Sequence, residues 1–363
     1  MKIGLVRRGY SATGGAERYL LRFATALSEA GHTPVLFAST AWPQDAWSLG
    51  PRVSVHGENP GQFAAALERL VSRRHCDFLF SLERVSACDC YRAGDGVHRA
   101  WLARRARHEP WIETWFRKLR PMHRELLLLE TQLFKNRRAR AVIANSALVR
   151  DEIVHHFGYP ADRIRIIPNG VPAPASTAET AAMRLKTRAE LGYDENDPIV
   201  LFVGSGWERK GLNYAVHAIN AVKNPNAQLL VAGRGNPAEC PTSRRTRFFG
   251  TDYDVRSLYA AADVFLLPTL YDPFSNACLE AFSYGLPVVT TRDNGFCELL
   301  TTGVDGHVLE NPADTTGMAQ ALDTWTTEGR ADDARESIRR TASVWTIERN
   351  LEATLAVVAE FSP

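Results

Sequence analysis

Short apolar runs alternate with amphipathic stretches along the first half of the chain. An apolar run bounded by turn residues is typical of a buried strand, whereas apolar residues that recur every three or four positions indicate a helix. These patterns predict strands at Ile3–Val6, Pro34–Ala38, Val53–His56, Asp77–Ser81 and Ala141–Ala144, and helices over Ala16–Ala30, Phe63–Arg74, Trp101–His108, Arg124–Lys135 and from Ser146 to about Phe157. The alternation favours a parallel sheet with helices on both faces.

The second half repeats this pattern after a predicted linker. The stretch RIRIIPNGVPAPAST, residues 163–177, collects proline, glycine and small polar residues, which is typical of a domain boundary. Beyond it, the patterns predict strands at Ile199–Val203, Gln228–Ala232, Arg247–Phe249, Val264–Leu267 and Pro287–Thr290, helices near residues 212–223, 255–262 and 276–284, and a last helix over Trp345–Phe361.

A chain of 363 residues has room for two such domains. We therefore predict an α/β protein with two doubly wound Rossmann-like domains facing each other across a cleft, at the carboxyl ends of their strands, where such sheets bind ligands. Residues 1–168 form the N-terminal domain, with an insertion at 99–140, and residues 169–345 form the C-terminal domain. Residues 346–363 are expected to form a helix that packs back on the N-terminal domain.

Positive charge is concentrated in that insertion, although the whole chain carries only +2. Residues 99–140 hold twelve Lys or Arg and four acids, a local charge of +8, interleaved with the aromatic residues Trp101, Trp111, Trp115 and Phe116. Cationic helices with aromatic anchors are typical of proteins that lie on anionic membranes. A solvated helix face is one alternative; nucleic-acid binding is another, but without a recognised motif we expect no nucleic-acid partner. The predicted contacts to a membrane or acceptor are Trp101, Arg104, Arg105 and Arg107.

Cysteine use and the N-terminus bear on location. The six cysteines form no CxxC pair, so buried free thiols in a reducing cytosol are expected. The N-terminus runs straight into a predicted strand without a signal-peptide pattern, and no apolar run approaches the ~20 residues that span a bilayer. We expect a cytoplasmic protein, peripheral on the inner face of the cell membrane.

Two adjacent cations, Arg209 and Lys210, follow a predicted strand and a Gly204-Ser205-Gly206 loop. Two such charges ~4 Å apart repel by about 4 kcal/mol at an effective dielectric constant of 20, and Glu208 can offset only part of this. A solvated turn is the plain interpretation. A bound diphosphate would supply the missing negative charge through charge-assisted hydrogen bonds.

A second candidate stretch is YDPFSNACLEAFSYGLPVV, residues 271–289. Asp272 falls in the loop after a predicted strand, and Glu280 falls in the second turn of the next helix. Carboxylates accept hydrogen bonds from vicinal hydroxyls, and the amides of Ser275 to Cys278, at the helix N-terminus, suit a phosphate. A capping Asp and a surface Glu are the alternative interpretation.

Paired glycines, Gly14 and Gly15, open the first long helix and let the backbone approach a ligand closely, although a plain turn explains them equally well. Together, GGAE at residues 14–17, the Arg209-Lys210-Gly211 loop and the acid-x7-Glu element resemble glycosyltransferase family 4 in their order along the chain. That family consists of retaining enzymes of the GT-B fold that use nucleotide-sugar donors.

The resemblance implies a role for each of these residues. Arg209 and Lys210 would neutralise the donor diphosphate in place of a metal, and Glu280 would hold the ribose hydroxyls. Donor binding would further involve Gly14, Gly15, Gly204, Asp272, Phe274, Ser275 and Asn276. The family usually has Glu where this chain has Asp272, and the shorter side chain reaches less far towards a sugar hydroxyl.

Within the family, CYRAGDGVHRAWLARR, residues 90–105, is similar to the lipopolysaccharide core glucosyltransferase I subgroup. Asp95 matches the acid of that subgroup and would face the reacting sugar as a catalytic residue; His98 would contact the same centre. A turn aspartate and a structural histidine are the alternatives. The acceptors of the subgroup are membrane lipids, which favours the membrane interpretation of the basic insertion.

The implied activity is transfer of a hexose, glucose, from a UDP-sugar co-substrate to a sugar hydroxyl of a lipopolysaccharide-core or other lipid-linked glycan. The N-terminal domain would bind the acceptor, and the C-terminal domain would bind the nucleotide-sugar donor. A non-catalytic sugar-nucleotide-binding protein and a sugar-nucleotide epimerase on the same fold are the alternatives. AGRGNPA, residues 232–238, imitates a dinucleotide loop, but only about ten residues precede the next strand, too few for a helical crossover. DYD, residues 252–254, imitates a metal motif, but Asp254 fits a helix N-cap. We expect no cofactor and no metal.

Overall fold

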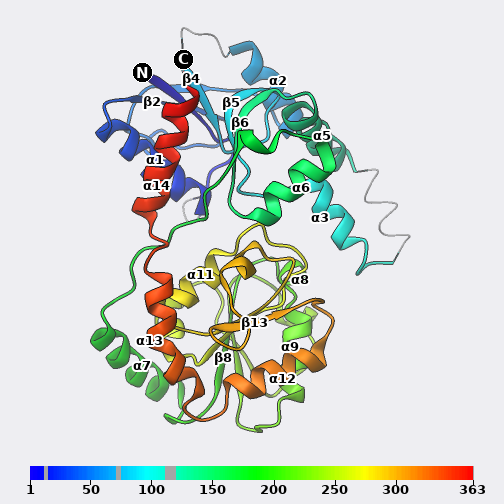
Figure 1. The fold of residues 1–363 in the computed structure, drawn as a ribbon, viewed down its shortest axis with the longest axis vertical. Coiled ribbons are helices and arrows are strands. Elements are labelled where there is room, and N and C mark those ends of the chain that lie inside the picture. Colours follow the sequence, from blue (N-terminus) through cyan, green and yellow to red (C-terminus); the bar gives the residue numbers. More distant parts are fainter. Residues whose placement is uncertain (12–14, 71–74, 111–119, 363) are drawn as a thin grey trace. The chain divides into compact units, whose positions relative to one another are not determined.

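The structure, a computed structural model, describes residues 1–11, 15–70, 75–110 and 120–362. Contacts within the chain divide it into two compact units: an N-terminal unit of residues 1–168 and 350–363, and a C-terminal unit of residues 169–349. Each unit is built around one parallel sheet (Figure 1). The C-terminal residues thus return to the N-terminal unit.

In the part of the chain described, the N-terminal unit has a sheet of seven parallel strands in the order β3-β2-β1-β4-β5-β6-β7. The strands are β1 (Lys2–Val6), β2 (Thr33–Ala38), β3 (Arg52–Ser54), β4 (Phe78–Ser81), β5 (Cys88–Arg92), β6 (Ala139–Ala144) and β7 (Ile164–Ile166). Successive side chains of a strand point to opposite faces. Val35 and Phe37 therefore enter one hydrophobic core, and Leu36 and Ala38 enter the other.

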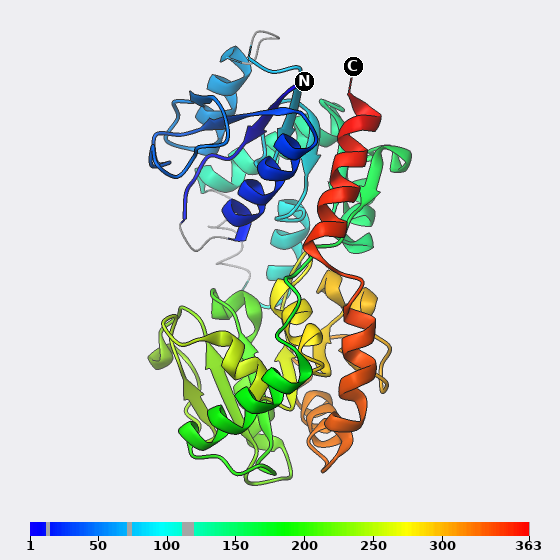
Figure 2. The same ribbon diagram turned by 90° about the vertical axis from the view of Figure 1, so that its left-hand side faces the viewer.

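Two helices far apart in sequence, α1 (Gly15–Glu29) and α14 (Ile347–Phe361), pack on the same face of this sheet (Figures 1 and 2). The hydroxyl groups of Tyr19 and Thr354 are 3.2 Å apart, and Val357 shares a core with Phe23. The other core receives residues from α2 (Pro60–Leu70), α3 (His98–Arg105), the π-helical turn η1 (Thr131–Lys135) that continues α5 (Pro121–Glu130), and α6 (Ala147–Phe157).

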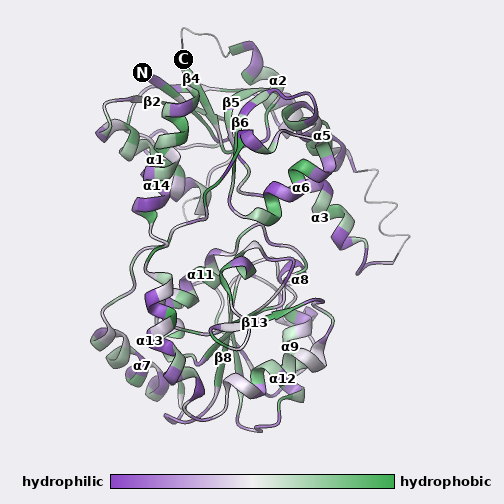
Figure 3. Ribbon diagram, in the orientation of Figure 1, coloured by the Kyte–Doolittle hydropathy of each residue, from purple (hydrophilic) through white to green (hydrophobic). Residues whose placement is uncertain are grey.

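The described residues of the C-terminal unit form a sheet of six parallel strands, in the order β10-β9-β8-β11-β12-β13. The strands are β8 (Ile199–Val203), β9 (Gln228–Ala232), β10 (Thr246–Phe248), β11 (Val264–Leu267), β12 (Val288–Thr291) and β13 (Gly306–Leu309). The main helices are α7 (Thr177–Leu191), α8 (Trp207–Lys210), α9 (Leu212–Ala221), α10 (Val255–Ala261), α11 (Asn276–Ser283), α12 (Thr315–Trp325) and α13 (Arg330–Ala342). Hydrophobic residues concentrate on the strands of both sheets, whereas the helices mix both kinds (Figure 3).

The predicted α/β architecture with two doubly wound sheets is confirmed. In each sheet the strand order reverses beside the first strand: β1 lies between β2 and β4, and β8 lies between β9 and β11. Ligands of such sheets bind outside the carboxyl ends of the strands at this switch point. The loops after β8 and β11, and those after β1 and β4, are therefore the places to look for function.

Several elements differ from the sequence prediction; helix α7, for example, was not predicted. Strand β5, with the sequence CDCYR, was not predicted because it is not an apolar run; Asp89 is accommodated by accepting the N–H of Leu79 at 2.8 Å and pairing with Arg140. The predicted helix at 124–135 ends in a π-helical turn. The short helix α8 was expected to be loop, and it changes the surroundings of Arg209 and Lys210.

All six cysteines are free; Cys240 and Cys297 are partly exposed and the others are buried. Among the described residues, no helix is both long and apolar enough to cross a bilayer.

Candidate functional site

The switch point of the C-terminal sheet is shaped by tight backbone contacts. Gly211 ends α8 with a φ of +76°, and a Cβ there would lie 2.0 Å from the carbonyl oxygen of Pro268, so only glycine fits. The carbonyl oxygen of Arg209 accepts hydrogen bonds from the Leu270 N–H at 2.9 Å and the Thr269 hydroxyl at 3.0 Å. These bonds fasten α8, which follows β8, to the loop that follows β11.

Asp272 compensates the two adjacent cations. Its Oδ2 atom bonds to the Lys210 ammonium and lies 3.9 Å from Nη1 of Arg209, which also donates to the Tyr271 carbonyl at 2.8 Å. The Lys210 and Asp272 side chains are 12% and 8% exposed, so the pair is shielded from solvent. The family resemblance implies a position for Asp272 near the donor sugar, and in this structure its carboxylate contacts Lys210.

The Lys210 stem packs over Gly204, within 3.5 Å of the position that a Cβ there would occupy. A Cβ at position 204 would be in ordinary van der Waals contact with the aliphatic part of this side chain, so the packing alone does not require glycine there.

The N-terminus of α11 is held by Asn294, which was missed in the sequence analysis. The Asn294 side-chain oxygen accepts the N–H groups of Ser275 at 3.2 Å and Phe296 at 3.1 Å, and this asparagine is fully buried. The Ser275 hydroxyl caps the N–H of Cys278. The expectation that all amides from Ser275 to Cys278 are available for a phosphate is therefore wrong. Among the described residues, those of Asn276 and Ala277 remain without a hydrogen-bond partner.

Asn169, at the start of the C-terminal unit, meets the same loop. Its side-chain amide donates to Oδ1 of Asn276 at 2.7 Å and approaches the carbonyl of Phe274 at 3.5 Å. Phe274 is buried against Phe296, with ring centroids 5.9 Å apart. Phe274 is thus anchored in the core, whereas Asn276 is exposed.

Glu280 has a fixed orientation. The Tyr259 hydroxyl donates to its Oε2 atom at 3.0 Å, and burial together with the Glu280 charge raises the pKa of Tyr259 well above its ordinary value. Tyr259 therefore stays protonated and acts as a donor. Nearby Cys278 is no candidate nucleophile, because burial raises the pKa of its thiol to about 12.

In the N-terminal unit, the switch point holds an ion-pair cluster. Arg7 pairs with Glu17 of α1 and with Glu83, each at 3.0 Å. Burial raises the pKa of Glu83, opposed by the Arg7 charge. Gly15 opens α1, and Gly14 lies outside the described residues.

Asp95 and His98 have different surroundings. The Asp95 side chain is 67% exposed, 4.0 Å from Arg84. His98 is buried, and its Nε2 lies 3.0 Å from Nδ1 of His123. Burial, followed by the charges of Arg84 and His123, lowers the pKa of His98 to about 4, so it is neutral at pH 7.

A fully buried carboxylate, Glu130, organises the start of α3 and was missed in the sequence analysis. It accepts the backbone N–H of His98, that of Arg99 at 3.1 Å, and Nε of Arg84 at 3.1 Å. A carboxylate at a helix N-terminus is electrostatically favourable. Because Glu130 lies inside the predicted helix Arg124–Lys135, no local pattern reveals this contact.

The basic insertion is less positive in space than in sequence. Arg104 pairs with Glu152, Arg138 with Glu68 and Arg140 with Asp89, and all three of these acids lie outside residues 99–140. Arg105 pairs with Glu109 and lies over the Trp101 ring, 5.5 Å from its centroid. Arg107 is exposed. Trp111, Trp115 and Phe116 lie outside the described residues.

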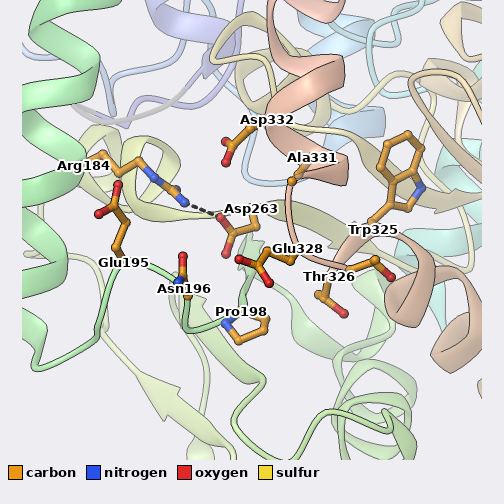
Figure 4. A pocket seen from close by; sticks show the side chains of 12 residues that line it. Arg184, Glu195, Asn196, Pro198, Asp263, Trp325, Thr326, Glu328, Ala331 and Asp332 are labelled. Carbon is orange, nitrogen blue, oxygen red and sulfur yellow. Dashed lines mark hydrogen bonds and ion pairs between the residues drawn. The ribbon is translucent and has the colours of Figure 1, made fainter.

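A small pocket of about 50 Å³ lies at the opposite end of the C-terminal sheet, where Pro198 precedes β8 and Asp263 precedes β11 (Figure 4). Asp263 there pairs with Arg184 and Arg188 and accepts the N–H of Ile199 at 2.8 Å. These contacts fasten α7 to the sheet, so this pocket is part of the scaffold. Asp254 caps α10 by accepting the Arg256 N–H, as predicted. No group of three or more potential metal ligands occurs among the described side chains.

Comparison with known proteins gives a consistent result. Residues 13–173 match the family described as Glycosyltransferase Family 4, and residues 197–328 match Glycosyl transferases group 1. A probable transglycosylase of Burkholderia thailandensis is 30% identical over 331 residues, covering 89% of this chain and 86% of the relative. The lipopolysaccharide glucosyltransferase WaaG of Escherichia coli is 22% identical, covering 84% and 83%.

Solved structures resemble the whole chain. The crystal structure of WaaG has a TM-score of 0.81 at 21% identity and covers 98% of this chain and 99% of its own. That of HepE from Anabaena in complex with UDP-glucose has a TM-score of 0.74 at 18% identity, covering 99% and 100%. At these identities the likeness establishes the fold.

Proposed function

Because the chain belongs to glycosyltransferase family 4, we propose that it transfers glucose from UDP-glucose to a sugar hydroxyl of a lipopolysaccharide-core or other lipid-linked glycan, with retention of configuration. The observation that carries the proposal is the cluster of Arg209, Lys210 and Asp272 at the switch point of the C-terminal sheet. WaaG, a relative along most of the chain, is named a lipopolysaccharide glucosyltransferase, and HepE was solved with UDP-glucose.

The electrostatics of the cluster suit a diphosphate. Two cations and one carboxylate leave a net charge of +1, and Arg209 is 37% exposed and can be reached from solvent. A diphosphate would bind Arg209 and compete with Asp272 for Lys210, and its leaving β-phosphate would be stabilised as charge develops. Preorganised donors of this kind each contribute about 10²–10³ in rate. In this proposal the cations do the work of a metal, and no metal is required.

The remaining parts have supporting roles. Glu280, oriented by Tyr259, would accept the ribose hydroxyls, and the Asn276 amide at the N-terminus of α11 would face a phosphate. Retention is what the family resemblance implies. Asp95 is solvent-accessible and would face the reacting sugar; His98, neutral and bonded to His123, would position the start of α3.

The acceptor side of the proposal involves a membrane. Trp101, Arg104 and Arg105 lie in α3 at helical spacing, and the exposed Arg107 follows two residues after the helix; these four residues are called one edge here. We propose that this edge contacts an anionic membrane surface or glycolipid headgroup at the inner face of the cell membrane. The ion pairs of Arg104 and Arg105 reduce the charge available for this, so Arg107 would contribute most.

The alternative is a protein that binds sugar nucleotides without turnover. The hydrogen bond between Lys210 and Asp272 favours it, because an aspartate held there is withdrawn from a donor sugar. Release of UDP from UDP-glucose by the purified protein, with and without extracted lipid-linked glycan, separates the two functions.

Variants make the test specific. Arg209→Ala and Lys210→Ala should each slow transfer by about 10²–10³. Lys186→Ala, which removes a 76%-exposed lysine from α7, is the matched control and should change nothing. Transfer at the wild-type rate in both site variants would eliminate the diphosphate role.

A further inference from the structure

The N-terminal unit contains a groove that the donor proposal does not use. It measures about 970 Å³, at the upper end of the range of ligand-binding pockets in proteins. It lies beyond the carboxyl ends of β1, β2 and β3 and is bordered by α2. Its lining includes Arg8, Ser39, Thr40, His56, Glu58 and Arg69.

Arg8 and its neighbour Arg7 are in opposite situations. Arg7 is neutralised by Glu17 and Glu83, whereas among the described residues neither Arg8 nor Arg69 has a carboxylate within 4.0 Å. Consecutive residues of an extended chain point to opposite sides, which explains why Arg7 joins the ion-pair cluster and Arg8 lines the groove. The groove therefore holds two guanidinium groups against one carboxylate.

The position of Arg8 is fixed on both sides. Its backbone N–H donates to Glu83 at 3.2 Å, and its carbonyl accepts the Ser39 hydroxyl at 2.6 Å. Its Nε atom is buried and has no hydrogen-bond partner. A buried donor left unpaired is rare in proteins and costs free energy, so an acceptor in the groove that draws this guanidinium group outward would recover a hydrogen bond.

We propose that this groove binds an acceptor saccharide that carries an anionic group, a phosphate or a carboxylate, with Arg8 and Arg69 holding the charge. Hydroxyl and amide side chains of Ser39, Thr40 and Gln62 line the same groove and can bond to sugar hydroxyls. Guanidinium groups match phosphate and carboxylate oxygens in geometry, which makes them suited to this task. The assignment of the saccharide as the acceptor rests on the proposed glycosyltransferase function.

The test measures binding of three sugars to the full chain by titration calorimetry: glucose 6-phosphate, glucuronate and glucose. The two anionic sugars should bind at least tenfold more tightly than glucose. Equal affinity for the two anionic sugars would indicate that the groove accepts either a phosphate or a carboxylate, and tighter binding of glucose 6-phosphate would indicate a phosphorylated saccharide. Equal binding of all three, or binding of none, would overturn the proposal.

Variants place the site. Arg8→Gln and Arg69→Gln should each weaken the anionic sugars at least tenfold and leave glucose unchanged, whereas Arg22→Gln, at an exposed position of α1, should have no effect. Arg69 is exposed, so its variant keeps the test valid if Arg8→Gln fails to fold. Unchanged affinity in Arg69→Gln together with any folded Arg8 variant would rule the groove out.

UDP binding, measured on the same samples, separates this inference from the proposed function. Anionic sugars that bind without any binding of UDP would remove the glycosyltransferase proposal and leave the groove. UDP binding with no charge preference among the sugars would remove the groove alone.

Discussion

Replacing Asp272 with Asn tests the charge cluster directly. The substitution keeps the shape of the side chain and removes the carboxylate that compensates Lys210 and Arg209. Because Lys210 and Asp272 are 12% and 8% exposed, the change leaves a shielded ammonium group beside a guanidinium group. We expect lower stability of the free protein and, at the same time, tighter binding of UDP.

The magnitudes follow from the burial. Breaking a buried ion pair by removing one partner costs about 3–5 kcal/mol, and the partial exposure of Arg209 points to the lower end, about 3 kcal/mol. For a unit of this size each kcal/mol lowers the melting temperature by about 2–4 °C, so a fall of about 6–12 °C is expected. Removal of the competing carboxylate should strengthen UDP binding by about tenfold, equivalent to ~1.4 kcal/mol.

The assay is a thermal melt of Asp272→Asn with and without UDP, followed by calorimetric titration of UDP and a rate measurement with UDP-glucose. The control is Asp333→Asn, an exposed acid in the first turn of α13, whose loss should cost under ~1 kcal/mol. A variant that melts with the wild type, or binds UDP more weakly, refutes the view that Asp272 is the counter-charge that a diphosphate replaces. Tighter UDP binding with a slower rate would show that the carboxylate also serves turnover.

Three further predictions concern other contacts in the two units. Tyr259→Phe removes the hydroxyl that donates to Glu280 and orients it. Because one hydrogen bond to a charged group is lost, the KM for UDP-glucose should rise by about tenfold at most, while kcat changes little. Tyr193→Phe is the control. The pKa of His98 is lowered to about 4, so this side chain stays neutral in the folded protein, whereas in the unfolded chain it takes up a proton near pH 6.5. The stability of the protein should therefore fall as the pH drops from 6.5 towards 4. His98→Gln should flatten that part of a profile of melting temperature against pH, and an unchanged slope would contradict the assignment. Replacing Arg104, Arg105 and Arg107 with Gln should weaken binding to anionic vesicles at low salt, measured by co-sedimentation. The loss of binding free energy should be about 1 kcal/mol per residue at most, and largest for Arg107. Binding equal to that of the wild type would mean that this edge is an ordinary solvated surface.

The strands that the sequence predicts well are those buried on both faces. Ile199–Val203 and Val264–Leu267 read as continuous apolar runs because helices cover both sides of a parallel sheet, so no position is required to be polar. Strand β5 is buried equally deeply but contains Asp89, whose charge is satisfied by Leu79 and Arg140 from neighbouring strands. The hydrogen bond and the ion pair of Asp89 form only when the strands pair in the folded sheet, so a local apolar pattern does not predict this strand.

The candidate site divides in the same way. Arg209, Lys210 and Glu280 could be proposed from the sequence because they follow a predicted strand or lie in a predicted helix and match motifs of the family that the chain resembles. Their partners are not: Asp272 is 62 residues from Lys210, and Asn294 is 19 residues from Ser275. Parallel strands bring such segments together at one edge of the sheet, and side-chain geometry then decides which groups pair.

The pairing of Lys210 with Asp272 also gives a physical reason for the adjacent cations that requires no ligand. A donor site made of unpaired cations would lower the stability of the folded protein, because like charges that are buried away from solvent repel strongly when no opposite charge compensates them. Asp272 lowers that cost in the free protein and can be displaced when a diphosphate arrives, because Arg209 is solvent-accessible from the start. The affinity for the donor is then the difference between two anions competing for the same ammonium group. The length of the side chain at position 272 would tune that difference, which gives the shorter aspartate at this position a consequence for donor binding as well as for its reach to a sugar.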